Sequence, residues 1–187
     1  MSNKHAVRKK ILERRNACSA SFIRARSARI AKRLFALPEF RRARSVLFYV
    51  SKGCEVDTHA MIKKAMRMRK KVVVPVTNTK RKTLLLSELR DFSDLAPGAY
   101  GILEPGKGKI KKVPARSLEL ALIPGVAFDE RGARVGFGGG YFDKLLKKVR
   151  APIVALAFDF QVVEEIACES HDARVHKIIT ERRVIDI

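Results

Sequence analysis

Four short apolar runs constrain the fold of this chain more than any other feature of its sequence. They are rich in valine, isoleucine and leucine, and they lie at 45–50 (SVLFYV), 71–76 (KVVVPV), 118–125 (LELALIPG) and 152–158 (PIVALAF). Runs that are apolar throughout predict strands buried on both faces, as in parallel sheets. A helical pattern at 58–70 separates the first two runs, which makes a βαβ unit. The sequence therefore predicts the α/β class: one three-layer domain over residues 1–187, with a mostly parallel central sheet flanked by helices.

The other elements carry weaker signals. Helices are expected at 4–17, from a cap at Ser19 or Ser21 to Leu37, from a cap at Thr58, at 141–149 and near 162–168. A strand is expected at TLLLSEL (83–89), and a closing strand at RVHKII (174–179) or RRVIDI (182–187). Proline and glycine are frequent between residues 91 and 116, which indicates loops there.

The charge of the chain indicates anionic ligands. Lys and Arg number 40 against 19 Asp and Glu, so the formal charge is +21 at pH 7. Such a charge attracts polyanions and phosphorylated ligands alike, and does not choose between them. Three widely spaced cysteines, Cys18, Cys54 and Cys168, do not form a disulfide framework and favour a reducing compartment. We expect a cytoplasmic protein without membrane association, because no apolar run is long enough to cross a bilayer.

The segment RVGFGGGYFD (134–143) is the strongest functional signal. Four of the five residues at 136–140 are glycine, which costs backbone entropy and lets main-chain N–H groups converge on one anion. Arg134 would supply charge, and Asp143, in the first turn of the following helix, would hold a divalent cation. The segment is neither a Walker A motif, which needs Lys-Ser/Thr after the glycines, nor a dinucleotide fingerprint, which needs a small residue where Tyr141 stands. The alternative is a tight turn with no ligand.

Two further groups of residues are candidates for ligand binding. Lys4 and Arg8 are four residues apart on a predicted helix, so both cations project from one face, where an anionic ligand would relieve their repulsion. Glu55 follows the strand at 45–50, at the carboxyl edge where open α/β sheets bind ligands. The alternatives are a solvated basic face for the first pair and a solvated carboxylate for Glu55.

Together these segments resemble the 5-formyltetrahydrofolate cyclo-ligases, also called 5,10-methenyltetrahydrofolate synthetases. The resemblance runs nearly end to end. It rests on Lys4-x-x-x-Arg8, LPEF (37–40), EVDT (55–58), IPGVAFD (123–129), RVGFGGGYFD (134–143) and VHKIIT (175–180). Their order and spacing make a chance match improbable.

The resemblance implies an ATP- and Mg²⁺-dependent enzyme that cyclises 5-formyltetrahydrofolate to 5,10-methenyltetrahydrofolate and releases ADP and phosphate. In that family the formyl oxygen attacks the γ-phosphoryl group to give an N5-iminium phosphate. N10 of the folate then attacks the activated carbon and phosphate leaves. Such chemistry depends on positioning and charge neutralisation, so no nucleophilic side chain is required. A monomer is expected, with folate and ATP as its ligands.

The resemblance also assigns residues. It implies that Asp143 binds Mg²⁺ and that Arg134 and Tyr141 act in catalysis. The implied ATP contacts are Lys4, Arg8, Arg134, Val135, Gly136, Phe137, Gly138, Gly139, Gly140, Tyr141 and Phe142. The implied folate contacts are Val50, Glu55, Phe137, Gly138, Gly139, Gly140 and Tyr141.

Three positions depart from the family pattern. Gly139 stands where Lys is frequent, Phe142 where Tyr is common, and His176 where some members have a metal-binding Asp. Imidazole is a poor ligand for Mg²⁺, so His176 is not expected to replace that Asp.

Two other functions compete with this one. The +21 charge motivates a nucleic-acid-binding relative without turnover, although three tyrosines and no tryptophan offer few stacking platforms for bases. The other is a different ATP-dependent ligase or small-molecule kinase on an α/β sheet.

Overall fold

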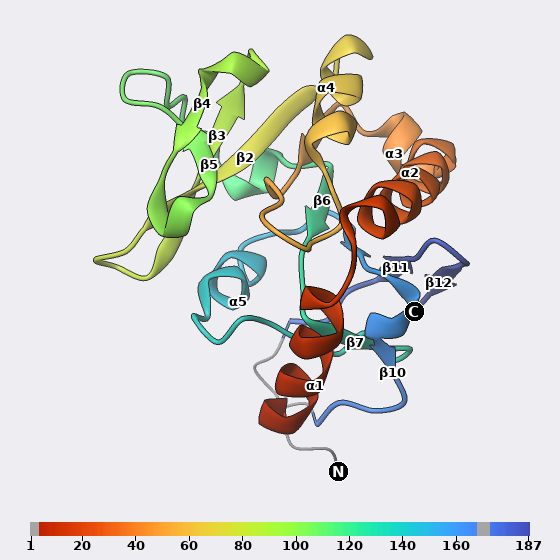
Figure 1. Ribbon diagram of the computed structural model, residues 1–187. Helices are drawn as coiled ribbons and strands as arrows, with labels where there is room; N and C mark the ends of the chain where they lie inside the picture. The colour runs from red at the N-terminus through yellow and green to blue at the C-terminus, as the bar shows by residue number, and fades with distance from the viewer. Residues whose placement is uncertain (1–3, 168–172) are drawn as a thin grey trace.

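A computed structural model describes residues 4–167 and 173–187, and its centre is a seven-stranded sheet (Figure 1). The strand order is β12-β11-β9-β6-β1-β2-β3, in which the five inner strands are parallel and the two edge strands antiparallel to their neighbours. The strands are β1 (Ser45–Leu47), β2 (Lys71–Asn78), β3 (Thr83–Leu89), β6 (Leu120–Ile123), β9 (Ile153–Leu156), β11 (Lys177–Ile179) and β12 (Val184–Asp186). The four apolar runs thus form four adjacent strands, which confirms the predicted parallel sheet.

Helices cover both faces of this sheet. They are α1 (Lys4–Asn16), α2 (Ala20–Ala36), α3 (Pro38–Arg42), α4 (His59–Arg67) and α5 (Tyr141–Leu146). Because successive side chains of a strand point to opposite faces, Val46 packs with α2 and α4, whereas Leu47 packs with Leu145 and Leu146 of α5. The predicted three layers are therefore present. None of the helices in the described ranges combines the length and the apolar character that a bilayer span needs.

Two small sheets flank the central one (Figure 1). β4 (Leu95–Pro97) and β5 (Leu103–Pro105) form a hairpin, and β10 (Val162–Val163), β7 (Ala127–Asp129) and β8 (Arg134–Val135) form a three-stranded sheet. α1 packs against β7 and β8, where Ile11 joins Val126 and Val135 in a separate apolar cluster. Short 3₁₀ turns complete the chain: η1 (Phe92–Asp94), η2 (Ala99–Gly101), η3 (Ala115–Ser117) and η4 (Asp159–Gln161).

Several local predictions are settled by the structure. Ser19 caps α2 by accepting from the Phe22 N–H at 3.1 Å, and both candidate closing segments form strands, β11 and β12. Thr58 precedes α4 but does not cap it, because its hydroxyl donates to the Tyr49 carbonyl at 2.7 Å. α5 ends at Leu146, three residues earlier than predicted.

The helix predicted near 162–168 is wrong over its described part. Val162 and Val163 form β10, which pairs in parallel with Phe128 and Asp129 of β7. The Asp129 carboxylate then accepts from the Ile166 N–H at 2.9 Å, and residues 164–167 form no helix. Cys168 lies outside the described residues.

Candidate active site

The candidate site lies at the carboxyl ends of β1, β6 and β9, the edge where α/β sheets bind ligands. Three loops and α1 meet there: the loop after β1 (48–58), the loop after β6 (124–126) and the glycine loop (136–140) between β8 and α5. The glycine loop approaches through Phe137, whose ring lies beside Arg15. Arg15 and the loops after β1 and β6 border a narrow cavity that is too small for a water molecule. Its lining residues are Arg15, Tyr49, Glu55, Val56, Pro124, Gly125, Leu156 and Gln161.

The glycine loop has the backbone conformation that its sequence predicts. Gly138 and Gly140 have φ of 99° and 67°, in the region that favours glycine, and Gly140 occupies the N-cap position of α5. A Cβ at Gly139 would lie 2.8 Å from the Tyr141 ring, so the Lys that is frequent there would force Tyr141 to move. No Cβ therefore shields the main chain at these three positions.

Arg8 joins α1 to the glycine loop. Its Nε donates to the Gly136 carbonyl at 2.9 Å, although the two residues are 128 positions apart in the chain. Its guanidinium carbon is also 4.0 Å from where a Cβ at Gly138 would lie. Lys4, one turn earlier, is the first residue of α1. The structure thus brings the predicted cationic helix and the predicted anion loop together.

Arg134 and Asp143 form an ion pair beneath this loop. The Arg134 side chain is 4% exposed, whereas that of Asp143 is 38% exposed. A Cβ at Gly136 would meet Arg134 Nη1 at 3.0 Å, so the guanidinium lies directly under the loop. Arg134 therefore orients the Asp143 carboxylate instead of presenting an open charge to a ligand, which differs from the sequence-based expectation.

Tyr141 connects the glycine loop to the hairpin of β4 and β5. Its hydroxyl lies 2.8 Å from that of Tyr100, and the two rings meet edge to face at 6.1 Å. The hydrogen bond to Tyr100 raises the pKa of Tyr141, so its hydroxyl remains protonated at neutral pH. Lys52, from the loop after β1, donates to the Tyr100 carbonyl, so the turn of the hairpin bridges the two loops.

Glu55 is half-buried at the edge of the cavity. Its Oε2 accepts from the Lys52 N–H at 2.8 Å. Burial raises the pKa of Glu55, while that hydrogen bond and the charges of Arg15 and Lys52 oppose the rise. Beside it, the buried Tyr49 hydroxyl donates to the Val56 carbonyl at 3.0 Å.

Glu55 is the expected site residue that lines the cavity. The side chains of three others pack toward apolar clusters. Val50 is 3% exposed and packs in the core beneath α2 and α4. Val135 is buried in the cluster under α1, and the half-buried Phe142 packs against the main core. Phe137, by contrast, is 51% exposed.

His176 lies at the opposite edge of the sheet, before β11, where its Nδ1 accepts from the Ile153 N–H at 2.9 Å. It thus lies at the amino ends of the parallel strands, whereas the candidate site lies at their carboxyl ends. Within residues 4–167 and 173–187, no three His, Cys, Asp or Glu side chains are grouped to hold a metal ion.

The sequence reasoning missed Arg15, Tyr100 and Lys52. Arg15 is 6% exposed, and its Cζ lies 5.1 Å from the centre of the Phe137 ring. Its spacing was a usable signal, because residues seven apart, such as Arg8 and Arg15, share one face of a helix. Tyr100 and Lys52 had no such signal, since only the tertiary fold brings their loops together.

The site thus combines a glycine-rich backbone loop, a nearby carboxylate and a narrow cavity at the carboxyl edge of a parallel sheet, an arrangement typical of α/β enzymes. Residues 1–181 match the model of the 5-formyltetrahydrofolate cyclo-ligase family, and the chain is an enzyme of this family.

Individual relatives agree with this family. The chain is 34% identical over 149 residues to 5-formyltetrahydrofolate cyclo-ligase from Haemophilus influenzae, covering 76% of this chain and 79% of the relative. It is 29% identical to that from Escherichia coli K12, over 93% and 98% of the two chains. The solution structure of Aquifex aeolicus 5,10-methenyltetrahydrofolate synthetase superposes with a TM-score of 0.87 at 33% identity, over 98% of this chain and 92% of that one.

Proposed function

We propose that the protein cyclises 5-formyltetrahydrofolate to 5,10-methenyltetrahydrofolate with consumption of ATP and release of ADP and phosphate. The observation that carries this proposal is the contact between Arg8 and the glycine loop, next to the cavity of Glu55. The glycine loop with Arg8 is suited to a triphosphate, and the cavity of Glu55 is suited to a polar ring. The reaction has one substrate of each kind, and both must bind side by side.

The triphosphate is assigned to the glycine loop and the first two turns of α1. Main-chain N–H groups of the loop would donate to phosphate oxygens, and Arg8 and Lys4 would neutralise their charge. Phosphoryl transfer needs such positioning more than it needs side-chain chemistry.

The folate is assigned to the cavity between Glu55 and the loop after β6. A carboxylate accepts hydrogen bonds from the amino group and ring N–H of a pterin, which gives Glu55 an orienting role. Tyr141, whose hydroxyl stays protonated, would donate to a folate acceptor or stack on its ring. The loop from Phe137 to Tyr141 lies between the two substrates and serves both.

The reaction then proceeds in two displacements. The formyl oxygen attacks the γ-phosphorus, the bond from that phosphorus to the β–γ bridging oxygen breaks, and ADP leaves. N10 attacks the activated formyl carbon and releases its proton to solvent, the carbon–oxygen bond breaks, and phosphate departs with both electrons of that bond. The chain holds the two substrates in line, and Arg134 acts as a positioning residue because it contacts Asp143 and not the reacting atoms.

Asp143 fits a magnesium ion that is carried by the nucleotide. Mg²⁺ commonly keeps several waters and takes only one or two protein carboxylates together with substrate phosphates. One Asp143 oxygen pairs with Arg134, and the side chain is exposed enough to offer the other to a metal. When bound, the ion would neutralise phosphate charge.

The decisive test follows the near-ultraviolet absorbance of methenyltetrahydrofolate. We expect this band to grow when purified protein is mixed with 5-formyltetrahydrofolate, ATP and Mg²⁺, and not when ATP is left out. A flat absorbance in the complete mixture, with both substrates shown to be intact, would contradict the proposal.

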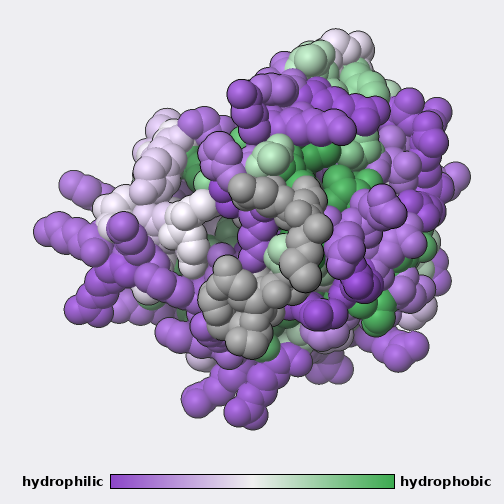
Figure 2. All heavy atoms as spheres, turned by 90° about the horizontal axis from the view of Figure 1, so that it is seen from below, coloured by the Kyte–Doolittle hydropathy of each residue, from purple (hydrophilic) through white to green (hydrophobic). Residues whose placement is uncertain are grey.

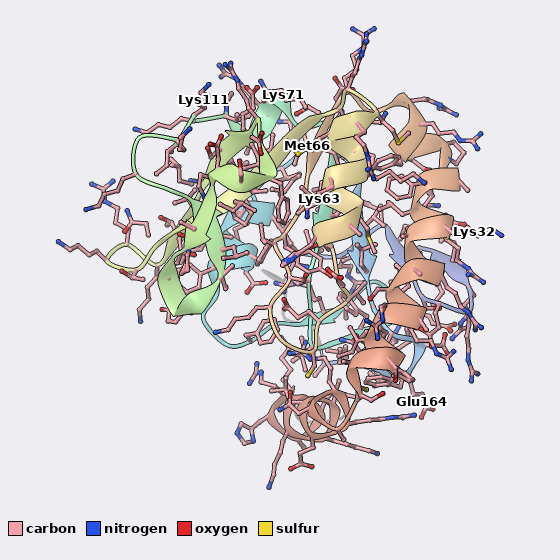
Figure 3. All side chains as sticks on the ribbon, turned by 45° about the horizontal axis from the view of Figure 1, so that its top comes forward. Lys32, Lys63, Met66, Lys71, Lys111 and Glu164 are labelled. Carbon is pink, nitrogen blue, oxygen red and sulfur yellow. The ribbon has the colours of Figure 1, made fainter. Side chains whose placement is uncertain are left out.

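Polyanion binding is a second candidate, supported by the distribution of charge. α2, α3 and α4 form one layer whose only acidic residue is Glu39. Figure 3 shows Lys32 extending from α2 and Lys63 on α4. A folded RNA duplex is the probe: binding that ignores ATP and weakens steeply with salt would support this second role.

A further inference from the structure

Arg15 is buried in α1 with an unused hydrogen-bond donor. The residue is 6% exposed, and its Nε has no hydrogen-bond partner among the described residues. The cavity beside it leaves no room for a water molecule. Neither the chain nor solvent therefore satisfies this donor.

Such a group lowers the stability of the free protein. A buried donor on a charged side chain that lacks a partner carries the full cost of its desolvation. The aromatic face of Phe137, 5.1 Å away, offsets part of that cost but accepts no conventional hydrogen bond. A fold retains a group of this kind where a ligand uses it.

The polar groups around Arg15 indicate which ligand that is. The Gln161 amide is committed to the carbonyls of Gly125 and Val126, and the Tyr49 hydroxyl to that of Val56. Glu55 uses Oε2 for the Lys52 N–H, whereas its Oε1 has no partner within the described ranges. The cavity therefore offers one cationic donor, from Arg15, and one anionic acceptor, from Glu55.

We propose that Arg15 contacts the folate, with its guanidinium donating to the carbonyl oxygen of the pterin ring while Glu55 accepts from the adjoining ring N–H and amino groups. The contact rests on the proposed function. A pterin carries that acceptor and those donors along one edge, which complements the two side chains. A phosphate does not, because Glu55 would repel it. Because the space beside the guanidinium is too narrow for a water molecule, Arg15 and the Phe137 ring that lies against it would move apart when the pterin binds.

The test compares Arg15→Met and Arg15→Lys with Arg14→Met. Arg14 is the matched control, because it also lies over an aromatic ring, that of Phe160 at 4.7 Å, but is exposed. Equilibrium binding of 5-formyltetrahydrofolate without ATP, the KM of each substrate, and the Tm of each free protein are measured. For Arg15→Met we expect the folate Kd to rise about 10- to 100-fold, the range for loss of a charged hydrogen bond.

The other readouts separate a ligand contact from a structural role. The ATP KM of Arg15→Met should stay within about twofold of wild type, and its Tm should equal or exceed the wild-type value, because an unpaired buried charge is removed. Arg15→Lys should regain part of the folate affinity, and Arg14→Met should match wild type throughout.

Unchanged folate affinity in Arg15→Met, with wild type binding folate normally, would overturn the contact and leave the proposed function standing. A rise in the ATP KM alone would assign Arg15 to the nucleotide and overturn it as well. A lower Tm with both KM values raised equally would make the residue structural. Wild type that binds no folate would overturn the proposed function together with this contact.

Discussion

At the candidate site, a buried partner beneath the glycine loop sets the orientation of an exposed side chain. Arg134 illustrates the point: its guanidinium is buried under the glycine loop and holds the Asp143 carboxylate, which faces outward. A short acidic side chain on a six-residue helix is thereby given one orientation. Because the proposed Mg²⁺ ligand is also the partner of Arg134, a single substitution at Asp143 should affect both stability and metal binding.

Replacing Asp143 with Asn should therefore have two separable effects. Loss of the carboxylate leaves the Arg134 charge buried without its partner, so we expect the free energy of unfolding to fall by about 1–3 kcal/mol. Turnover should fall, and the Mg²⁺ concentration that supports half-maximal activity should rise. Urea unfolding and a Mg²⁺ titration of activity measure the two effects.

The double variant Arg134→Met, Asp143→Asn removes the orphaned charge and should recover stability without activity. A double variant with normal activity would remove Asp143 from the metal site.

Because of Glu55, we expect folate affinity to rise with pH while the stability of the folded protein falls. Burial raises its pKa above the ordinary value of 4.5, so the folded protein holds this proton more tightly than the unfolded chain. Its contribution to stability is then greatest below 4.5 and is lost as pH rises through the raised pKa. Folate affinity, which needs the carboxylate, should increase over the same interval.

The Glu55→Gln variant checks both signs. Without the titrating group, the variant should become more stable relative to wild type as pH rises above 4.5, and its weaker folate binding should no longer follow pH there. Thermal melts and folate binding, recorded in parallel between pH 4.5 and 7.5, provide the comparison. Identical pH profiles for wild type and variant would mean that Glu55 titrates elsewhere and does not orient the folate.

At the scale of elements, the site is a junction of segments from distant parts of the chain. α1 contributes Arg8 and Arg15, the loop after β1 contributes Glu55, and the hairpin turn contributes Tyr100, whose φ of 56° is unusual for a residue with a side chain. The glycine loop and the adjacent Tyr141 contact Arg8, Arg15 and Tyr100. We therefore expect the proposed nucleotide binding to depend on the backbone conformation of this loop.

A Gly138→Ala substitution tests that dependence. The φ of 99° strains any residue with a Cβ by about 1–2 kcal/mol, although nothing lies closer than 4.0 Å to the added atom. Gly108→Ala is the matched control, since Gly108 has φ of 80° and open space around it in the turn after β5. Both variants should lose similar stability, but only Gly138→Ala should raise the ATP KM, by about tenfold or more. Equal ATP kinetics in the two variants would exclude the loop as the phosphate site.

How much of this could be read from the sequence depends on the range of the interaction. The apolar runs predicted adjacent strands because burial on both faces leaves a continuous local pattern. The glycine loop is local as well, because its composition alone marks it, and Glu55 was selected because it follows a predicted strand. The short helix near 162–168 was wrong because pairing with β7 and the bond from the Ile166 N–H to Asp129, 37 residues earlier, engage this segment instead. Tyr100 was missed because its partners come from other elements.

For the whole molecule, the dominant property is the excess of positive charge. The 40 Lys and Arg residues outnumber the 19 Asp and Glu residues, which leaves a formal charge of +21 on 187 residues. Figure 2 shows hydrophilic residues over most of the face seen from below. The helices α2, α3 and α4 carry much of this charge on one side of the sheet. Like charges repel one another in the compact state, and the same field attracts anionic substrates.

Salt should therefore stabilise this protein while weakening its hold on substrates. The screening length falls from about 30 Å at 0.01 M to about 10 Å at 0.1 M salt, which removes most of the repulsion between cations spread over the surface. We expect Tm to rise as NaCl increases across this range, and the KM values for ATP and folate to rise with it, because attraction to the site is screened as well. Differential scanning calorimetry and the absorbance assay, run in the same buffers, measure both.

Sucrose is the control for effects not caused by charge. It should raise Tm, and because it does not screen charge it should not raise either KM in that way. A Tm that falls with NaCl would show that attractive ion pairs, such as Arg134 with Asp143, outweigh the net repulsion.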